Sequence, residues 1–471
     1  MRRFKFLLPL LAMLLLLPDL CMAAEHFHLP KDLSIIWVIP FVCMLLSIAL
    51  GPLTVPHFWE HHFGKVAIFW GLAFLVPCAL TFGFGNALFL ALDSILLEYL
   101  PFILLLVALF TVAGGIRLKG SLVGTPVVNT GILTIGTFIA SWMGTTGAAM
   151  LLIRPLLRAN AHRKYRVHQV VFFIFLVANI GGSLSPLGDP PLFLGFLKGV
   201  SFFWTTTHVF LLTVIASVIL LALYFVIDTV LYKKEGSPVP PASSKSDEKL
   251  GFEGNINFLF LLLVVVNTLM SGQWQGPKFH IYGVEMELQN VVRDLLYIVI
   301  AFLSWHFTDI GCRKRNDFTW GPILEVAKLF IGIFLSMIPA ISILRAGKEG
   351  ALAALVNLTQ NANGEPINAM FFWMTGALSS FLDNAPTYLV FFNTAGGDPV
   401  TLMNEAATLV AISAGAVFMG ANTYIGNAPN FMVKAISEEQ GVKMPSFFGY
   451  MAWSVGILCP VFLLLTFMFF I

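Results

Sequence analysis

The chain has 471 residues, of which 58% are hydrophobic and only 11% are charged, whereas a soluble globular domain carries about 25% charged residues. Its net charge of +2 is too small to indicate nucleic-acid binding, so both of these classes are excluded. A membrane-spanning helix needs about 20 apolar residues, and long unbroken apolar runs exclude the alternating pattern of a barrel. We therefore predict an all-α polytopic membrane protein with about ten to eleven transmembrane helices, whose surroundings are the lipid bilayer.

Residues 1–24 have the features of a secretory signal peptide. Basic Arg2, Arg3 and Lys5 precede an apolar run over 6–17, and small residues follow at Ala23 and Ala24. This order is typical of a cleaved signal, although an uncleaved anchor helix remains the alternative. We predict a multi-pass protein of the bacterial inner membrane whose first crossing starts from the periplasm. The sequence leaves the oligomeric state open, with a homodimer among the options.

The remaining chain divides into two helical halves joined by a polar linker. Each half is predicted to hold full crossings, one re-entrant hairpin and one helix broken by glycine and proline. The predicted ranges are 25–231 for the first half, with hairpin 123–153 and broken helix 167–200; 232–254 for the cytoplasmic linker; and 255–471 for the second half, with hairpin 370–393 and broken helix 403–437.

The basic residues in the loops orient these segments. They form four clusters, at Arg117 and Lys119, over 154–166, at Lys233 and Lys234, and over 313–315. Short cytoplasmic loops carry an excess of Lys and Arg. All four clusters lie in the cytoplasm when 123–153 enters and leaves on one side, but a full crossing there would separate two of them. The rule therefore favours a hairpin at 123–153.

Two motifs recur at one offset. Residues 183–193 align without gaps with 421–431, which places Asp189 on Asn427, and Thr145 aligns with Asp383 at the same offset of 238 residues. The last helices of the halves, 207–231 and 446–471, also correspond, and the predicted threading runs them in opposite directions. We predict an inverted repeat, an architecture in which secondary transporters bind their substrate near the midplane where helices break.

The candidate binding residues gather at these breaks. Asp383 is the strongest functional signal, because a carboxylate in an apolar segment costs about 2.5 to 3.5 kcal/mol unless it is paired, protonated or bound to a cation. Asp189 is the second. Capping of the following helix is the alternative role for either acid. The full set predicted to bind the ion and the substrate is Asp383, Asn384, Asp189, Thr145, Thr146, Asn179, Ser183, Ser185, Asn422, Thr423 and Asn427, with sodium at Asp383 as the one metal ion expected.

At these motifs the sequence resembles the ion transporter superfamily, which includes NhaD-type sodium/proton antiporters, citrate transporters of the CitMHS type, arsenite pumps and dicarboxylate/sodium symporters. The residues that carry the resemblance lie at 179–191, 381–386 and 420–427. The resemblance implies paired hairpins whose polar tips meet at a midplane site and move against a scaffold. Thr145 and Thr146 stand where antiporter relatives often have Asp-Asn, so one candidate carboxylate is missing here.

Two transport hypotheses follow, both without an enzymatic step or a bound cofactor. In the first, sodium/proton antiport by alternating access, Asp383 with Asp189 as helper exchanges sodium for protons. In the second, a sodium- or metal-coupled citrate or carboxylate transporter, helix N-termini and Ser, Thr and Asn donors bind the anion. No arginine lies at either break to bind a carboxylate, which favours the first. Intramembrane aspartyl proteolysis is a third reading, but Pro186 replaces the first glycine of its Gly-x-Gly-Asp signature.

Overall fold

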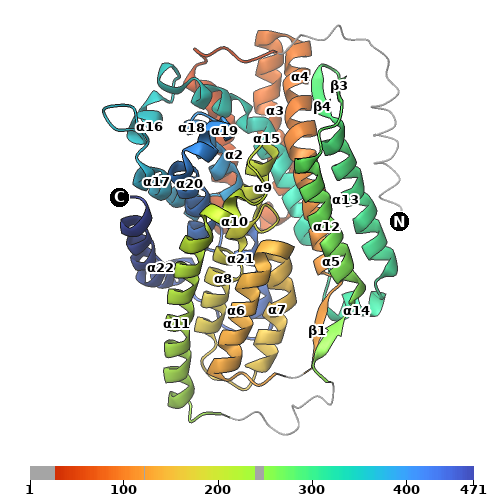
Figure 1. Cartoon of the computed structure of the whole chain (residues 1–471), viewed down its shortest axis with the longest axis vertical. Coiled ribbons are helices and arrows are strands. Elements are labelled where there is room, and N and C mark those ends of the chain that lie inside the picture. The colour runs from red at the N-terminus through yellow and green to blue at the C-terminus, as the bar shows by residue number, and fades with distance from the viewer. Residues whose placement is uncertain (1–26, 121, 239–248) are drawn as a thin grey trace.

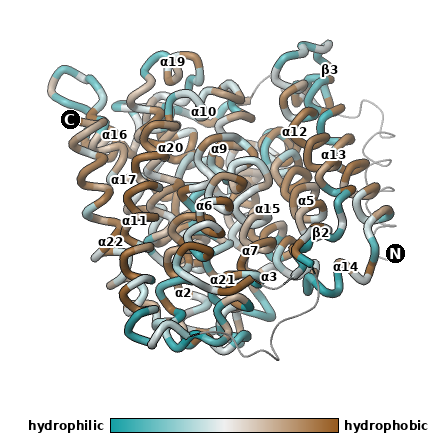
Figure 2. The backbone as a smooth tube through the Cα atoms, turned by 60° about the horizontal axis from the view of Figure 1, so that its bottom comes forward, coloured by the Kyte–Doolittle hydropathy of each residue, from teal (hydrophilic) through white to brown (hydrophobic). Residues whose placement is uncertain are grey.

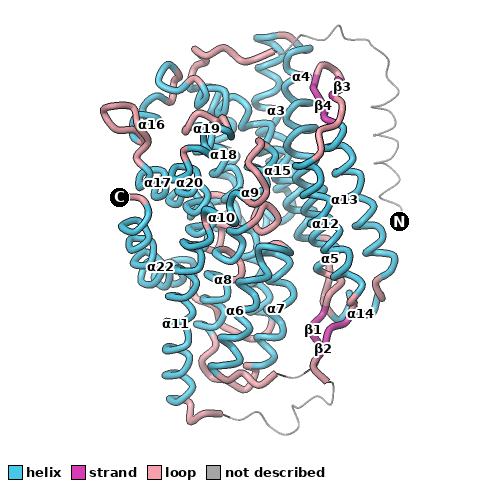
Figure 3. Tube along the Cα trace, in the orientation of Figure 1, coloured by secondary structure: helices cyan, strands magenta, loops and turns pink. Residues whose placement is uncertain are grey.

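The computed structural model describes residues 27–120, 122–238 and 249–471, so the predicted signal peptide lies outside the described residues. In this part of the chain the fold is predominantly helical, and two short strand pairs lie in connecting loops (Figure 3). Among the described residues, ten helices are long and apolar enough to cross a membrane. Hydrophobic residues follow the helices, and hydrophilic residues concentrate in loops (Figure 2). The chain is therefore an all-α polytopic membrane protein, as predicted.

The helices form two groups (Figure 1). The hairpin group contains both predicted hairpins and both broken helices: α6 (Pro126–Met143), α7 (Thr145–Ala159), α8 (Val167–Leu176), η4 (Ile180–Leu184), α9 (Pro190–Leu197), α10 (Trp204–His208), α11 (Phe210–Lys234), α17 (Asn368–Phe381), α18 (Asn384–Thr394), α19 (Pro399–Asn404), α20 (Ala406–Met419), η7 (Gly420–Asn422), α21 (Ala428–Glu439) and α22 (Phe447–Phe469).

The flanking group packs against it and contains η2 (Ile35–Val38), α2 (Ile39–Thr54), α3 (Pro56–Phe82), α4 (Phe84–Ser94), η3 (Ile95–Tyr99), α5 (Leu100–Ala113), α12 (Ile256–Gln273), α13 (Leu288–Phe307), α14 (Ile310–Arg315) and α15 (Gly321–Arg345). The connecting segments hold β1 (Arg117–Lys119), β2 (Gly251–Glu253), β3 (Lys278–Ile281), β4 (Val284–Glu287), η6 (Gly347–Glu349) and α16 (Ala353–Leu358). Both strand pairs, β1 with β2 and β3 with β4, are antiparallel.

The segment predicted as the first hairpin consists of α6 and α7. Thr125 begins α6 by accepting a hydrogen bond from the Val128 amide (3.3 Å), and Pro126 fills the first helical position, where no amide donor is needed. Gly144 ends the helix. The start of α6 and the end of α7 lie together, because the Gly124 amide donates to the Ala159 carbonyl (2.9 Å). The two arms therefore enter and leave at one end of the protein.

The broken helices cross the hairpin group in opposite directions. In Figure 1, α8 lies below α9, whereas α20 lies above α21. The second helix of each broken pair packs on the hairpin of the other half. Thus α9 packs against α18, and α21 packs against α7. The span Val167–Leu184 is 89% buried within the protein, whereas Pro56–Phe82 of the flanking group is 22% buried. The first broken helix therefore lies inside the protein, where irregular backbone is tolerated at membrane depth.

Ion pairs involve three of the four basic clusters at one end of the protein, and the fourth, Lys233 and Lys234, directly precedes Glu235, which takes part in one of these pairs. These pairs are Arg117–Glu253 (3.2 Å), Arg315–Glu253 (3.2 Å), Arg154–Asp317 (3.1 Å) and Arg163–Glu235 (3.3 Å). In Figure 1 this is the lower end, with β1 and α14, and the β3–β4 hairpin lies at the opposite end. A shared end for every cluster is the arrangement that the loop charges require.

Candidate functional site

Each hairpin turns at a helix break. Gly144 joins α6 to α7 with a φ of +82°, a conformation that glycine adopts without a steric penalty. In the second hairpin the break falls at Asp383, whose Oδ1 accepts a hydrogen bond from the Ala385 amide (3.0 Å). Asp383 therefore caps α18, the alternative role considered for it. Its side chain is half-buried.

Asp189 connects the two hairpin tips. It precedes α9, but its side chain makes no capping hydrogen bond to that helix. Its carboxylate accepts instead from Thr145 Oγ1 (2.9 Å) and from Asn427 Nδ2 (3.1 Å). Asn384 Nδ2 donates to the second carboxylate oxygen. Asp189 thus bonds to the first hairpin, the second hairpin and the second broken helix, and helix capping does not account for its position.

The Asp189 carboxylate is enclosed without a basic partner. The residue is 2% exposed, and its hydrogen-bond partners in the described part of the chain are two amides and one hydroxyl. A buried carboxylate is costly unless it is paired with a cation, protonated or fully hydrogen-bonded. The site is therefore suited to take up a cation or a proton beside Asp189.

The contact between Asp189 and Asn427 relates the two halves directly. These residues are equivalent in the sequence repeat, 238 positions apart, and their side chains touch. The backbone around them repeats as well. A Cβ placed on Gly188 would lie 2.1 Å from the Gly182 carbonyl oxygen, and one on Gly426 would lie 2.5 Å from the Gly420 oxygen. Only glycine permits this close approach, so both breaks need it at the same aligned positions.

Two further asparagines complete the crossing point of the broken helices. Asn179 Nδ2 donates to Asn430 Oδ1 (2.7 Å), and Asn427 Nδ2 lies 3.2 Å from Asn179 Oδ1. Asn430 Nδ2 donates to the Gly420 and Thr423 carbonyls of its own broken helix (2.8 and 2.9 Å). These amides satisfy carbonyls that the unwound backbone leaves free, and they hold the two breaks together.

Two amide oxygens at the second hairpin and its broken helix have no donor. Asn384 Oδ1 and Asn422 Oδ1 are buried and accept no hydrogen bond in the described part of the chain. Asn422 Nδ2 donates to Ser380 Oγ (2.9 Å), which fixes the orientation of that amide, because Ser380 directs its own hydrogen to backbone carbonyls. Unpaired oxygens of this kind are suitable ligands for a hard cation.

Two hydroxyls fix the breaks to the hairpins in the same way in both halves. Ser185 Oγ donates to the Ser141 carbonyl, and Thr423 Oγ1 donates to the Ser380 carbonyl. Ser141 and Ser380, which the sequence analysis did not single out, lie on the first arms of the hairpins. Ser141 aligns at the offset of 238 with Ser379, the residue before Ser380, so the sequence repeat leads only to the neighbouring position.

Two of the predicted residues lie outside this arrangement. Ser183 Oγ bonds to Thr213 Oγ1 of α11 (2.7 Å) and to the Ile180 carbonyl (2.8 Å), so it links the first break to a neighbouring helix. Thr146 is half-buried in the first turn of α7, and its side chain makes no hydrogen bond within the described residues. The structure does not bring either residue to Asp189.

Four helix N-termini converge around Asp189. It precedes α9 and bonds to Thr145 at the start of α7, Asn384 at the start of α18 and Asn427 just before α21. Each N-terminus carries a partial positive charge and unpaired amide donors. The field of these four helices stabilises negative charge, both on Asp189 and on any anion that binds beside it.

A polytopic helical protein whose broken helices and hairpin tips surround a buried acid has the architecture of a secondary transporter. Residues 30–470 match the profile of the family CitMHS_2, described as "Putative citrate transport". The chain belongs to this family, which confirms the resemblance to citrate transporters within the ion transporter superfamily, and it is a secondary transporter. No curated protein matches the chain.

Proposed function

We propose that this protein carries citrate or a related small carboxylate across the membrane together with a coupling cation, sodium or a proton, that binds at Asp189. The single observation that supports this most is the meeting of both hairpin tips at one buried acid. The family match reverses the order of the two hypotheses drawn from the sequence, because it favours the carboxylate over sodium/proton antiport.

The geometry offers separate places for anion and cation. Helix N-termini attract a carboxylate, while Asp189 and the unpaired oxygens of Asn384 and Asn422 supply the negative charge and the lone pairs that a cation needs. Binding of the cation neutralises Asp189, which lowers the repulsion that an approaching carboxylate would meet. The cation and the substrate therefore favour each other's binding, which is the basis of coupled transport.

Alternating access would follow from the arrangement of the helices. The two halves are proposed to form an inverted repeat, with the end that carries the four basic clusters in the cytoplasm of a bacterial cell. The hairpin group would then move against the flanking group and expose the site to each side in turn. Asp383, one residue before Asn384, adds a second negative charge at the same tip.

Uptake measurements test the proposal. Purified protein in proteoliposomes should accumulate radiolabelled citrate with saturable kinetics, and the rate should rise with external sodium or with external acidity. Empty liposomes and an Asp189→Asn variant are the controls. Citrate uptake equal to that of empty liposomes, at every sodium concentration and pH tested, would refute carboxylate transport.

Sodium/proton antiport remains the second candidate, because two acids, Asp189 and Asp383, lie at the tips without an ion-pair partner in the described chain. A pH-sensitive dye inside the same proteoliposomes distinguishes the two. Proton movement driven by sodium in the absence of any carboxylate would favour antiport, whereas sodium-driven proton movement that needs citrate would favour coupled uptake.

A further inference from the structure

Arg293 is a buried arginine at the contact between the two helix groups. It lies in the second turn of α13 in the flanking group and is 2% exposed. Its guanidinium lies over the ring of Phe193 on α9, 5.9 Å from the ring centre. Nε donates to Asp294 Oδ1 (2.9 Å) and Nη1 donates to Asn290 Oδ1 (3.0 Å). The side chain is therefore held in place on two of its three nitrogens.

The third nitrogen is unused. Arg293 Nη2 is buried and has no hydrogen-bond partner among the described residues. Leaving a buried charged donor unpaired destabilises a protein more than leaving a neutral one unpaired. Asn290 and Asp294 lie close to the guanidinium, but they accept hydrogen bonds from Nη1 and Nε and not from Nη2. An open position of this kind is suited to an oxygen acceptor that arrives from outside the protein.

Two other buried arginines use both of their Nη groups, although Arg313 leaves its Nε without a partner among the described residues. Arg163 directs both of its Nη groups to oxygen acceptors, Asp228 Oδ1 and the Gly124 carbonyl. Arg313 directs both of its Nη groups to backbone carbonyls at the other end of the flanking group. Both side chains therefore use the end of the guanidinium that recognises carboxylates, and Arg293 keeps half of that end free.

Arg293 reaches the helix that starts at the site. Phe193 follows Asp189 by four residues, which is about 6 Å along α9. Gly272 of α12 also lies against α9, at Phe196, so the flanking group covers this face of the short helix. Arg293 therefore contacts α9 one turn beyond Asp189, the acid that precedes this helix.

We propose that Arg293 binds one carboxylate of the substrate through Nη2 and thereby selects di- and tricarboxylates over monocarboxylates. The inference rests on the proposed function, and it supplies the arginine that neither break contains. Asp294 is the internal counter-ion that keeps Arg293 paired while the site is empty. Removal of Asp294 should therefore strengthen the attraction for an anionic substrate, and removal of Arg293 should weaken it.

Transport kinetics with a graded set of substrates test the assignment. In proteoliposomes, Arg293→Gln should raise the KM for citrate about tenfold or more, because a charge-assisted hydrogen bond is lost. The KM for a monocarboxylate of the same size should change less than about twofold, since one carboxylate already occupies the helix N-termini. Arg293→Lys keeps the charge without the planar donors and should fall between wild type and Arg293→Gln.

Asp294→Asn should change the KM for citrate in the opposite direction. It should lower the KM for citrate about threefold, because the positive charge of Arg293 then lacks a counter-ion. A merely structural role would make both variants worse, so an increase of KM in Asp294→Asn as well as in Arg293→Gln would overturn the proposal. Arg313→Lys, a buried arginine away from the site, is the matched control for loss of folded protein and should leave the KM for citrate unchanged.

The two levels of the proposal fail in different ways. If wild type transports no carboxylate, the proposed function fails and the role of Arg293 fails with it. If wild type transports citrate and neither Arg293→Gln nor Arg293→Lys changes the KM, the role of Arg293 alone is refuted. A tenfold change that is equal for mono-, di- and tricarboxylates would also refute it, because carboxylate selection would then lie elsewhere.

Discussion

Each half of the hairpin group contains a hairpin followed by a broken helix. The aspartates of the two halves, however, lie at different aligned positions. At four positions related by the offset of 238 residues, one half carries an aspartate and the other a neutral side chain: Asp189 and Asn427, Thr145 and Asp383, Asp228 and Thr466, and Asp398 and Asn160. For the first pair the reason lies in the geometry. The two side chains touch, and two buried carboxylates in contact cannot both be ionised, whereas an amide donates a hydrogen bond to its partner.

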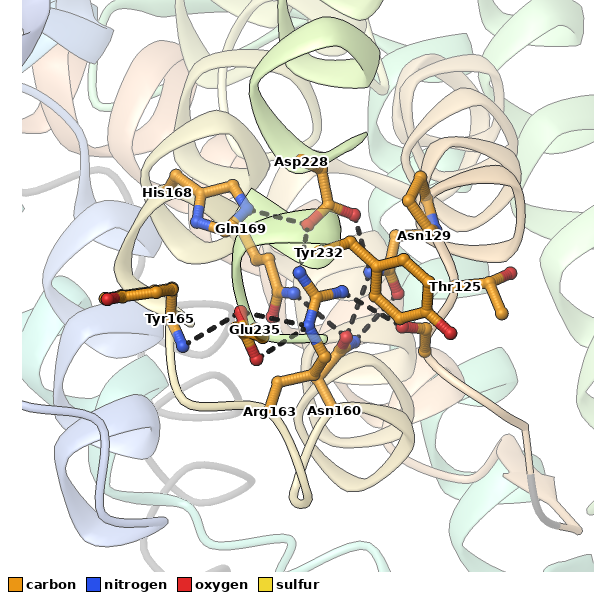
Figure 4. A network of polar contacts seen from close by, with 12 residues as sticks. Thr125, Asn129, Asn160, Arg163, Tyr165, His168, Gln169, Asp228, Tyr232 and Glu235 are labelled. Atoms are coloured by element: carbon orange, nitrogen blue, oxygen red, sulfur yellow. Dashed lines mark hydrogen bonds and ion pairs between the residues drawn. The ribbon is translucent and has the colours of Figure 1, made fainter. Parts of the chain in front are cut away.

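The third pair shows the largest difference. In the first half Asp228 of α11 is fully buried and lies in a network beside the linker (Figure 4). Arg163 Nη2 donates to its Oδ1 (2.9 Å), His168 Nε2 lies 2.8 Å from the same oxygen, and Asn129 Nδ2 donates to Oδ2 (3.0 Å). The network joins α6, α8, α11 and the loop after α7. One acid therefore holds that end of the first half together.

The second half uses a neutral bond at the equivalent position. Thr466 Oγ1 of α22 accepts a hydrogen bond from Trp373 Nε1 of α17 (2.9 Å). A hydrogen bond between membrane helices contributes about 0.6 kcal/mol on average, far less than a buried ion pair loses when one partner is removed. The comparison indicates that at this aligned position the first half is fixed by buried charge, while the second half is fixed by a neutral hydrogen bond.

The largest expected effect is a loss of stability when Asp228 is replaced. Asp228→Asn should destabilise the protein by about 3 kcal/mol, because Arg163 loses one of its two buried carboxylate partners. Thr466→Val, the matched change in the second half, should cost about 0.6 kcal/mol. Thermal unfolding of the purified protein in detergent measures both. Equal losses in the two variants would contradict the division between a charged and a neutral half.

The next effect concerns the central pair. Asp189→Asn should lower the rate of citrate uptake about 100-fold, because the replacement removes the charge and one of the oxygens that accept three hydrogen bonds, each worth about 1.5 to 3 kcal/mol to a charged group. Uptake into proteoliposomes at matched protein density measures the rate. An Asp189→Asn variant with more than a third of the wild-type rate would remove Asp189 from the site.

A smaller effect is expected at the unpaired oxygens. Asn384→Ser should weaken the apparent affinity for the coupling cation about tenfold, because it removes one oxygen ligand and one donor to Asp189. Asn393→Ser is the control on the same helix, since Asn393 is equally buried but bonds to the Leu389 carbonyl. The sodium or proton concentration that gives half-maximal citrate uptake is the readout, and equal shifts in both variants would speak against a cation at Asn384.

The smallest effect is predicted for Asp383. Asparagine caps helices about as well as aspartate, so Asp383→Asn keeps the start of α18 and should reduce citrate uptake less than about fivefold. The same uptake assay with Asp189→Asn alongside provides the comparison. A larger loss in Asp383→Asn than in Asp189→Asn would reverse the assignment and restore the order of the two acids that the sequence suggested.

Much of the architecture could be predicted from local patterns. Apolar runs interrupted by glycine and proline indicated the membrane class and both pairs of breaks, and the shared offset of 238 related them. The surroundings of Asp189 could not be predicted, because its hydrogen-bond partners lie 44, 195 and 238 positions away in the sequence. Asp383 bonds to the start of its own helix. Because it is a carboxylate in an apolar segment, the sequence analysis ranked it first.

The residues that the sequence analysis missed depend on contacts between distant helices. Asp228 lies in an apolar segment, where an acid signals a buried partner, and its partner Arg163 was assigned to a basic loop. Arg293 contacts α9 through the ring of Phe193, and nothing near it in sequence indicates that contact. Pairing across helices therefore has to be read from the structure.

The central claim is that Asp189 binds the coupling cation between the two hairpin tips. Equilibrium binding of citrate to the purified protein, measured over a range of sodium concentrations and pH, tests it most directly. Wild type should bind citrate more tightly as sodium or proton concentration rises, and Asp189→Asn should bind citrate with an affinity that no longer depends on either. Unchanged cation dependence in Asp189→Asn, with the dependence lost in Asp383→Asn instead, would contradict the claim.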